Sequence, residues 1–293
     1  MTIPGYTLYR LSDTIFWSVV LSGVLLCLCH AARRAFRHPL PTDALPGGRR
    51  AAETAGDEEV ERHTPFQRFF HWANFLTVAV LLVSGLAIYR SPFLPFLKGS
   101  AASWFSWHQW FTPVFLALVV AHILYEYRAP SHIDHVWFGK EDWGGLALIV
   151  RNFFGLTGDY PRYRKYHPAQ ILFHWAIAGN LLALVLTGFV LWKPLRGLLP
   201  LSLLGLGWDF IFYNRILHGF FTATLTALIL THIYFGVFIK KNWPETRSMI
   251  TGTIPQQEYV EYHQPLSRTL PDSGRRPPAP SPEGSSRSKV PAM

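Results

Sequence analysis

Two histidines interrupt an otherwise apolar stretch, RILHGFFTATLTALILTHIYFGVF at 215–238. His218 and His232 are 14 residues apart, which is about 21 Å along a helix that rises about 1.5 Å per residue. At about 100° per residue, the second imidazole returns to within roughly 40° of the first. Ionisable side chains inside apolar helices are costly and are functional candidates by default. The spacing therefore predicts two sites on one face, one near each end of a single helix.

Five apolar runs account for the helices that would hold such sites. A membrane-crossing helix needs about 20 mostly apolar residues, and 49% of the 293 residues are hydrophobic. The runs lie at 14–32, 69–89, 108–127, 171–192 and 214–239. We therefore expect an all-α integral membrane protein, in which the last four runs form a four-helix transmembrane bundle and the first is an extra N-terminal transmembrane helix.

Composition divides the chain further. A stretch near 141–157 is amphipathic and too polar to span, which predicts a helix lying in the membrane interface. The end of the chain is rich in Pro, Ser, Gly and Arg and is expected to be disordered. We find no internal repeat of useful strength. The expected segments are an outer N-terminal segment (1–13), the extra transmembrane helix (14–32), a cytoplasmic linker (33–65), the four-helix core (66–250) and a cytoplasmic tail (251–293).

Lysine and arginine are shared unevenly among the connecting segments. The segments on one side of the membrane hold 21 of these residues, and those on the other side hold 6. The richer side comprises 33–68, 128–170 and the tail from Lys240. The positive-inside rule then predicts a multi-pass protein of a bacterial inner membrane, with the N-terminus outside and the C-terminus in the cytoplasm. Loops that face anionic lipid explain the net charge of +9, so it requires no nucleic acid partner.

The direction of each predicted helix sets the depth of its histidines. The helix at 214–239 runs from outside to inside, so His218 lies near the outer face and His232 near the inner face. His71 begins a helix on the inner side, and His108 begins a helix on the outer side. Depth therefore pairs His108 with His218 and His71 with His232.

Two imidazoles that face each other across a bundle suit the iron of a haem, which they hold with no position open to substrate. Gly85, Gly188 and Gly219 would leave room for a flat macrocycle. Arg68 and Arg215 each precede a candidate ligand by three residues and could pair with haem propionates. A structural zinc site is not expected, because four nitrogen or sulfur ligands do not converge at one depth.

A second pairing fits the spacing equally well. His122 also follows His108 by 14 residues, so His122 could face His232 and leave His71 as a bystander. Geometry from the sequence leaves both pairings open. His122 and His174 are otherwise expected to hydrogen-bond to the backbone or to join a proton relay.

Several motifs appear in a characteristic order across 66–250. They are FQRFFHW, LLVSGLAIY, WHQWFTPVF, RKYHPAQ, LTGFVLWKP, RILHGFF and THIYFGVF. In this order the chain resembles the gamma, cytochrome b, subunits of membrane-bound formate dehydrogenases, and more distantly those of nickel–iron hydrogenases and related respiratory complexes. The extra helix has no counterpart in the shortest members of that family.

The resemblance implies two b-type haems with axial ligands at His71, His108, His218 and His232, and it ranks His71 above His122. It also implies a quinone site at the inner haem, near His167, Ala169, Gln170 and His232. The formate dehydrogenase pattern reads Asn-Ala-Gly-Gln at 167–170, whereas this chain reads His-Pro-Ala-Gln, which keeps Gln170 and changes position 167.

The function expected from the resemblance is electron transfer across the membrane, between a catalytic and iron–sulfur partner and the quinone pool. The subunit would have no chemistry of its own on the primary substrate, and its partners would be an iron–sulfur subunit, a catalytic subunit, quinone and membrane lipid. His167, at the cytoplasmic mouth, could relay protons to the quinone.

The alternative is a transporter or membrane anchor without cofactor, whose histidines line a proton or metal path. Such a path usually includes acidic residues within the helices. The predicted core helices are almost free of them, since Glu126 lies at a helix end and Asp209 in a loop. This composition favours the haem protein.

Overall fold

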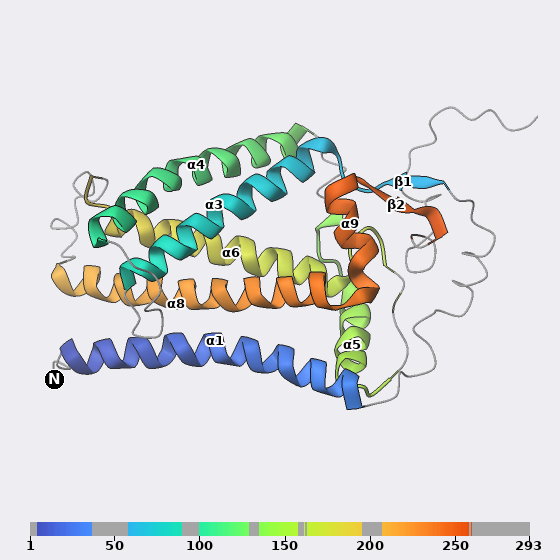
Figure 1. The fold of residues 1–293 in the computed structure, drawn as a ribbon, viewed down its shortest axis with the longest axis horizontal. Helices are drawn as coiled ribbons and strands as arrows, with labels where there is room; N and C mark the ends of the chain where they lie inside the picture. Colours follow the sequence, from blue (N-terminus) through green and yellow to red (C-terminus); the bar gives the residue numbers. More distant parts are fainter. Residues whose placement is uncertain are drawn as a thin grey trace, which may run out of the picture.

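The computed structural model describes residues 5–36, 58–89, 100–128, 135–157, 161, 163–194, 207–257 and 259. Within these residues, five helices are long and apolar enough to cross a membrane, which confirms the predicted all-α membrane architecture (Figure 1). These helices are α1 (Gly5–Phe36), α3 (Pro65–Tyr89), α4 (Ala101–Arg128), α6 (Pro168–Leu191) and α8 (Trp208–Ile233). The linker residues 37–57, the loops 90–99 and 195–206 and the tail from 260 lie outside the described residues.

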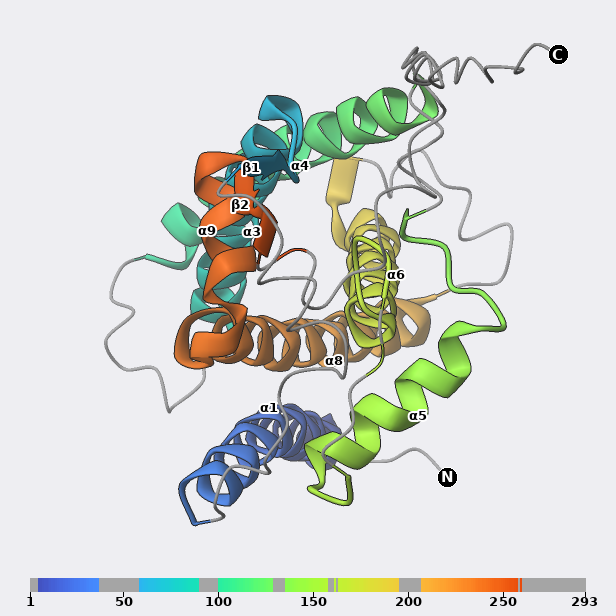
Figure 2. The ribbon, with the colours of Figure 1, turned by 90° about the vertical axis from the view of Figure 1, so that its right-hand side faces the viewer.

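The four core helices pack as two neighbouring pairs. α3 packs along α4, and α6 packs along α8. Viewed from one end, the four helices surround a common centre (Figure 2). Val78, Phe115 and Leu225 are buried together there and come from three of these helices. The burial of this apolar layer is what fixes the register of the helices that carry histidines.

The extra helix α1 runs along the outside of α8 (Figures 1 and 2). The two backbones approach closely at Gly23, where an added Cβ would lie only 2.9 Å from the Cβ of Ala227. Phe16, Val20 and Ala223 form a buried cluster at the same contact. Small residues at the contact allow this approach, as in many membrane helix pairs.

Two short helices lie across one end of the bundle (Figure 1). They are α5 (Asp142–Phe153), which occupies the stretch expected to form an interfacial helix, and α9 (Trp243–Thr251). Between α8 and α9 the chain forms a π-helical turn, η2 (Tyr234–Phe238), and a 3-10 turn, η3 (Lys240–Asn242). We refer to this end of the bundle as the α9 end and to the other as the far end.

Parts of the expected linker and tail pair with each other. β1 (Glu59–Glu61) and β2 (Thr253–Pro255) form a two-stranded antiparallel sheet, in which Val60 faces Ile254. The turn into β2 requires a glycine at position 252. Gly252 has φ 93°, which side-chain-bearing residues rarely adopt, and an added Cβ would lie only 3.2 Å from the carbonyl oxygen of His63. The segments 33–65 and 251–293 are therefore structured where they meet, since ladder hydrogen bonds and the burial of Ile254 hold them together.

The two helix pairs are related by an internal repeat. The motif TPFQRFFHW at 64–72 corresponds to HPAQILFHW at 167–175. Each copy begins with a reciprocal cap: Thr64 and Gln67 exchange side chain–backbone hydrogen bonds before α3, and His167 and Gln170 exchange the same bonds before α6. The expectation of no useful repeat is therefore wrong. The repeat is visible in the sequence itself, because Pro, Gln, Phe, His and Trp recur at the same places in both motifs.

Candidate functional site

The first histidine pair lies at the α9 end. The ring centroids of His71 on α3 and His232 on α8 are 6.2 Å apart, with an interplanar angle of 53°. Trp72, next to His71, donates a hydrogen bond from Nε1 to the backbone oxygen of Met249 in α9, at 3.0 Å. The sequence order of the helices and this contact to α9 place both imidazoles near the same end of the bundle.

The second histidine pair lies toward the far end. The ring centroids of His108 on α4 and His218 on α8 are 6.5 Å apart, with an interplanar angle of 76°. The buried layer of Val78, Phe115 and Leu225 comes from positions midway along the helices, between the two pairs. The bundle thus holds two bis-imidazole arrangements separated by apolar side chains.

Both spacings would let two imidazoles share one haem iron. Because an imidazole nitrogen binds a metal at about 2 Å and the ring centroid lies about 1 Å beyond it, two imidazoles on one metal can have centroids roughly 6 Å apart. Glycines leave the edges of two rings clear: a Cβ at Gly85 would lie 3.4 Å from Cε1 of His108, and one at Gly188 would lie 3.5 Å from Cε1 of His218. An added Cβ at Gly219 would meet nothing within 4 Å, so the space beside this residue is open.

Two hydroxyl groups hold the rings of the second pair. Ser84 Oγ lies 3.0 Å from Nδ1 of His108, and Thr187 Oγ1 lies 2.8 Å from Nδ1 of His218. Each hydroxyl residue immediately precedes one of the two glycines at the ring edges, Gly85 or Gly188. Each half of the repeat therefore places a hydroxyl, followed by a glycine, beside Nδ1 of its histidine.

The structure pairs His71, and not His122, with His232. The ring of His122 stacks on Phe70 at 4.0 Å, with an interplanar angle of 12°. In the other half of the repeat, Phe173 stacks on His232 at 5.8 Å. His122 also lies 4.0 Å from the Glu126 carboxylate one turn later.

Neither arginine contacts a candidate ligand in the described residues. Arg68 donates from Nη1 to the backbone oxygen of Ile250 at 2.6 Å, so its side chain holds α9 against α3. The guanidinium of Arg68 also lies against the turn at Gly252, and its pairing with a haem propionate stays a prediction. Arg215 is exposed on α8, three residues before His218.

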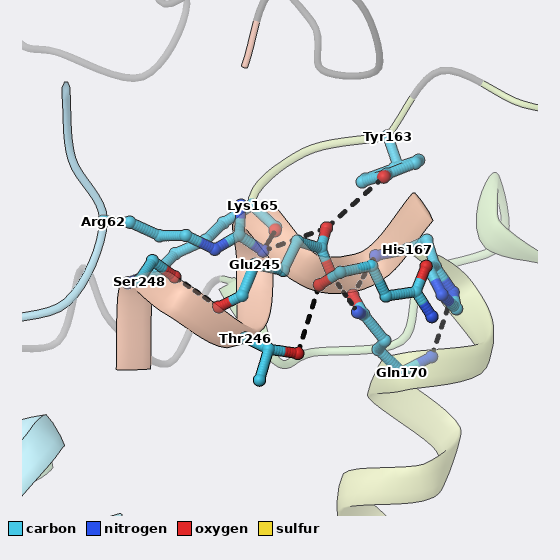
Figure 3. Close-up of polar contacts among 9 residues, drawn as sticks. Arg62, Tyr163, Lys165, His167, Gln170, Glu245, Thr246 and Ser248 are labelled. Carbon is cyan, nitrogen blue, oxygen red and sulfur yellow. Dashed lines mark hydrogen bonds and ion pairs between the residues drawn. The ribbon is translucent and has the colours of Figure 1, made fainter. Parts of the chain in front are cut away.

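A polar cluster lies at the α9 end, beside the start of α6 (Figure 3). Glu245 of α9 is at its centre: Gln170 donates from Nε2 to Oε2 of Glu245 at 2.6 Å, and Tyr163 donates from its hydroxyl to Oε1 at 3.5 Å. Arg62 forms an ion pair with the same carboxylate at 3.4 Å and donates to the backbone oxygen of Lys165 at 2.9 Å. We call Arg62, Tyr163, His167, Gln170 and Glu245 the α9 cluster.

His167 serves this cluster as a helix cap. Its Nδ1 accepts a hydrogen bond from the backbone N–H of Gln170 at 3.1 Å, and Ala169 lies between them in the first turn of α6. Burial is the main cause that lowers the pKa of His167 from 6.5 to about 4, and the charges of Arg62 and Lys241 act in the same direction. A neutral imidazole with a committed Nδ1 is a poor proton carrier near pH 7, so a relay through His167 is disfavoured.

A different group in this region titrates nearer to neutral pH. Burial, followed by the charge of Arg62, lowers the pKa of Lys165 from 10.5 to about 8. Lys165 precedes the α6 cap by two residues. Its ammonium can therefore lose and regain a proton under ordinary conditions.

Sequence reasoning missed Glu245, Arg62 and the two hydroxyls. Glu245 and Arg62 lie far from Gln170 in sequence, and only the fold of α9 and the β1–β2 sheet brings them together. A signal for Ser84 and Thr187 was available, because each lies 13 residues after the histidine of an FHW motif and immediately before a glycine.

Comparisons with known proteins find relatives among cytochrome subunits. A cytochrome subunit of the F420 non-reducing hydrogenase II of Methanosarcina mazei is 24% identical over 254 residues, covering 73% of this chain and 90% of that protein. The cytochrome b556(Fdn) subunit of the nitrate-inducible formate dehydrogenase of Escherichia coli is 22% identical over 202 residues, covering 67% of this chain and 84% of that protein. These matches confirm the resemblance inferred from the motifs. The sequence model of the family described as "Prokaryotic cytochrome b561" matches residues 62–252, so the chain belongs to the prokaryotic cytochrome b561 family.

Proposed function

We propose that this chain carries electrons across a membrane within a respiratory oxidoreductase, using two b-type haems. One haem would be held by His71 and His232, and the other by His108 and His218. Family membership makes the chain a membrane cytochrome b of electron transport. The number of haems, their ligands and the quinone site are the parts that we add.

The observation that carries the proposal is the pairing of four histidines from three helices. Their ring centroids are 6.2 Å and 6.5 Å apart, and an apolar layer separates the two pairs. A bound haem would supply one-electron redox chemistry at each pair. The chain itself would provide two imidazole nitrogens to each haem and would leave no open position for a substrate at the metal.

The partners follow from the names of the relatives. One relative is a hydrogenase cytochrome subunit and another is a formate dehydrogenase cytochrome subunit. These names support a catalytic subunit that exchanges electrons with this chain, and the motif resemblance adds an iron–sulfur subunit to the proposal. All chemistry on the primary substrate would take place in those partners.

The α9 end is the proposed cytoplasmic end and the proposed site of quinone reduction. The richer share of lysine and arginine flanks this end, which favours a cytoplasmic location with the N-terminus outside. In the α9 cluster, Gln170 offers an amide for hydrogen bonding to a quinone oxygen. Glu245 and Lys165 are the groups that would deliver protons there, since reduction of a quinone to a quinol takes up two protons.

Haem counting in variants of the full-length membrane protein tests the proposal. We expect two b-type haems per chain from a pyridine haemochrome assay and a reduced-minus-oxidised spectrum. His71→Ala and His232→Ala should each lose one haem, and His108→Ala and His218→Ala should lose the other. His122→Ala and His174→Ala are the matched controls and should retain both.

The same measurement separates the alternative function. A cofactor-free transporter or membrane anchor would purify without a haem spectrum, and its histidine variants would change transport or assembly alone. Retention of two haems by His71→Ala together with loss of one by His122→Ala would support the pairing of His122 with His232 instead.

A further inference from the structure

Ser84 and Thr187 occupy matching places beside the second histidine pair. We propose that their hydroxyls hold His108 and His218 in the tautomer that carries hydrogen on Nδ1, and that they thereby lower the reduction potential of an iron bound between the two Nε2 atoms. The inference rests on the proposed function, because it requires a haem at this pair. It makes Ser84 and Thr187 positioning residues for the electron-transfer site.

The hydrogen bonds of Ser84 determine which atom donates. A serine hydroxyl has one hydrogen to give, and Oγ lies 2.6 Å from the backbone oxygen of Val80. A carbonyl oxygen only accepts, so the hydroxyl hydrogen goes to Val80. The contact of 3.0 Å to His108 is then made by Nδ1–H donating to Oγ. Ser84 is 1% exposed, which leaves no room for water to take over this role.

A second backbone contact of Ser84 supports the same assignment for His108. The serine Oγ also lies 3.1 Å from the backbone oxygen of Leu81. Both carbonyl oxygens can only accept, so the hydroxyl hydrogen points to the backbone of α3 and Nδ1–H of His108 donates to Oγ.

Thr187 repeats the arrangement on α6. Its Oγ1 lies 2.7 Å from the backbone oxygen of Ala183 and 2.8 Å from Nδ1 of His218. The hydroxyl hydrogen again goes to the carbonyl, and the imidazole again donates. Asn214 donates from Nδ2 to the backbone oxygen of Thr187 at 2.8 Å, which fixes α6 against α8 at this level.

The tautomer has an electronic consequence. With hydrogen on Nδ1, the lone pair of each neutral ring is on Nε2, which is then the nitrogen available to a metal. A hydrogen bond from the other ring nitrogen raises the basicity of a ligand imidazole. A more basic pair of ligands favours the oxidised iron and lowers its potential.

The first pair lacks this device. Among the described residues, the ring nitrogens of His71 and His232 have no side-chain hydrogen bond of the kind that Ser84 and Thr187 make. The second pair should therefore hold the iron of lower potential. Electron transfer from the far end to the α9 end is then downhill, toward the proposed quinone site.

Redox titration of three variants tests the inference. In Ser84→Ala, Thr187→Val and the double variant, we expect two haems per chain as in the parent protein. The lower of the two midpoint potentials should rise in each single variant and rise further in the double variant, and the higher potential should not move. The low-spin electron paramagnetic resonance signal of one haem should shift with it, and Thr187→Ser should restore the parent values.

Thr77→Ala is the matched control. Thr77 is 4% exposed on α3, like Ser84, and its hydroxyl donates to the backbone oxygen of Ala73 at 2.8 Å. Its described contacts include no histidine. Its removal should leave both potentials unchanged, which separates loss of a buried hydroxyl from loss of the hydrogen bond to a ligand.

The outcomes distinguish this inference from the proposed function. An unchanged or lowered potential in both Ser84→Ala and Thr187→Val, at full haem content, overturns the role of the hydroxyls. If His108→Ala loses one haem in the same preparation, the haem at the second pair stands and only the tautomer inference fails. If His108→Ala keeps two haems, the proposed function itself fails. Should Ser84→Ala not fold, the comparison of Thr187→Val with Thr187→Ser carries the test.

Discussion

Gln170 donates a hydrogen bond to Glu245 at 2.6 Å, although the two residues are 75 positions apart in the sequence. The bond joins the first turn of α6 to α9. The carboxylate also pairs with Arg62, whose side chain is 2% exposed, while that of Glu245 is 20% exposed. One oxygen of Glu245 thus holds a buried cation while the other faces the residue that the family resemblance assigns to quinone.

Glu245→Gln should slow exchange with quinol without loss of haem. The substitution keeps the size of the side chain but removes its charge and its ability to carry a proton. Because a positioned acid or base contributes about 10²–10⁴-fold to a proton-coupled step, we expect quinol-driven haem reduction to fall by at least about 10²-fold. Stopped-flow spectra would measure that rate, and dithionite would show the total haem.

A surface carboxylate gives the control for this experiment. Glu59 pairs with Arg247 at 3.9 Å, and both side chains are at least half exposed. Exposed pairs contribute little, so Glu59→Gln should behave as the parent protein. A normal quinol rate in Glu245→Gln would mean that Glu245 serves only to hold α9 in place.

Gly188→Leu should remove the haem of the second pair. A Cβ at this position would already lie 3.5 Å from Cε1 of His218, so a larger side chain must displace the imidazole. We expect one haem per chain and one remaining potential. Gly179→Leu is the control on the same helix, because an added Cβ there meets nothing within 4 Å. Equal haem loss in both variants would point to general disruption of α6.

His167→Asn should reduce the acid sensitivity of the fold. The pKa of His167 is about 4 in the folded protein, where the side chain is buried, and 6.5 when it is not buried, as in the unfolded chain. At a pH between these two values, the unfolded chain therefore binds a proton that the folded chain does not. Stability therefore falls as the pH drops through that window. Asparagine is a good helix cap and does not titrate there.

Thermal unfolding in detergent at pH 7 and pH 4.5 would measure this difference. The parent protein should lose more of its melting temperature on acidification than His167→Asn does. The charged groups that act on His167 are Glu245, Arg62 and Lys241, and all three are unchanged in the variant. The same loss in both proteins would assign the acid sensitivity to one of those groups.

Gly23→Leu should detach α1 from α8 and leave both haems bound. The Cβ contact of 2.9 Å with Ala227 leaves no space for a side chain at this position. We expect a lower melting temperature and an unchanged haem content, since the four candidate ligands lie on α3, α4 and α8. Ser22→Leu is the control, because the neighbouring Ser22 is exposed. Loss of haem in Gly23→Leu would show that α1 supports the core directly.

Helix spacing predicted the parts of the site that lie along single helices. The 14-residue step from His218 to His232, with the direction of each span, predicted ring neighbours at two depths, and the structure shows such neighbours at both. Spacing alone left His71 and His122 open as partners of His232, and only the family resemblance ranked His71 first. Gly85 and Gly188 lie beside the rings of His108 and His218, and Gly219 borders open space. Periodicity carries this information because every turn of a long apolar helix has the same geometry.

The contacts made at the end of the bundle could not be predicted in the same way. The hydrogen bond from Arg68 to the carbonyl of Ile250 is one such contact, because it depends on α9 folding back onto α3. Glu245 joined the cluster through the same fold. Such contacts depend on how short helices and a two-stranded sheet close over the bundle, and local sequence does not encode that path.

The apolar layer of Val78, Phe115 and Leu225 makes movement of charge between the two histidine pairs sensitive to voltage. The 14-residue separation of His218 and His232 corresponds to about 21 Å, out of a hydrocarbon thickness of about 30 Å. A unit charge that crosses the whole thickness does work of about 2.3 kcal/mol for each 100 mV of membrane potential. Electron transfer between the two pairs, as proposed, would therefore be electrogenic, and an energised membrane would hold back or drive its turnover.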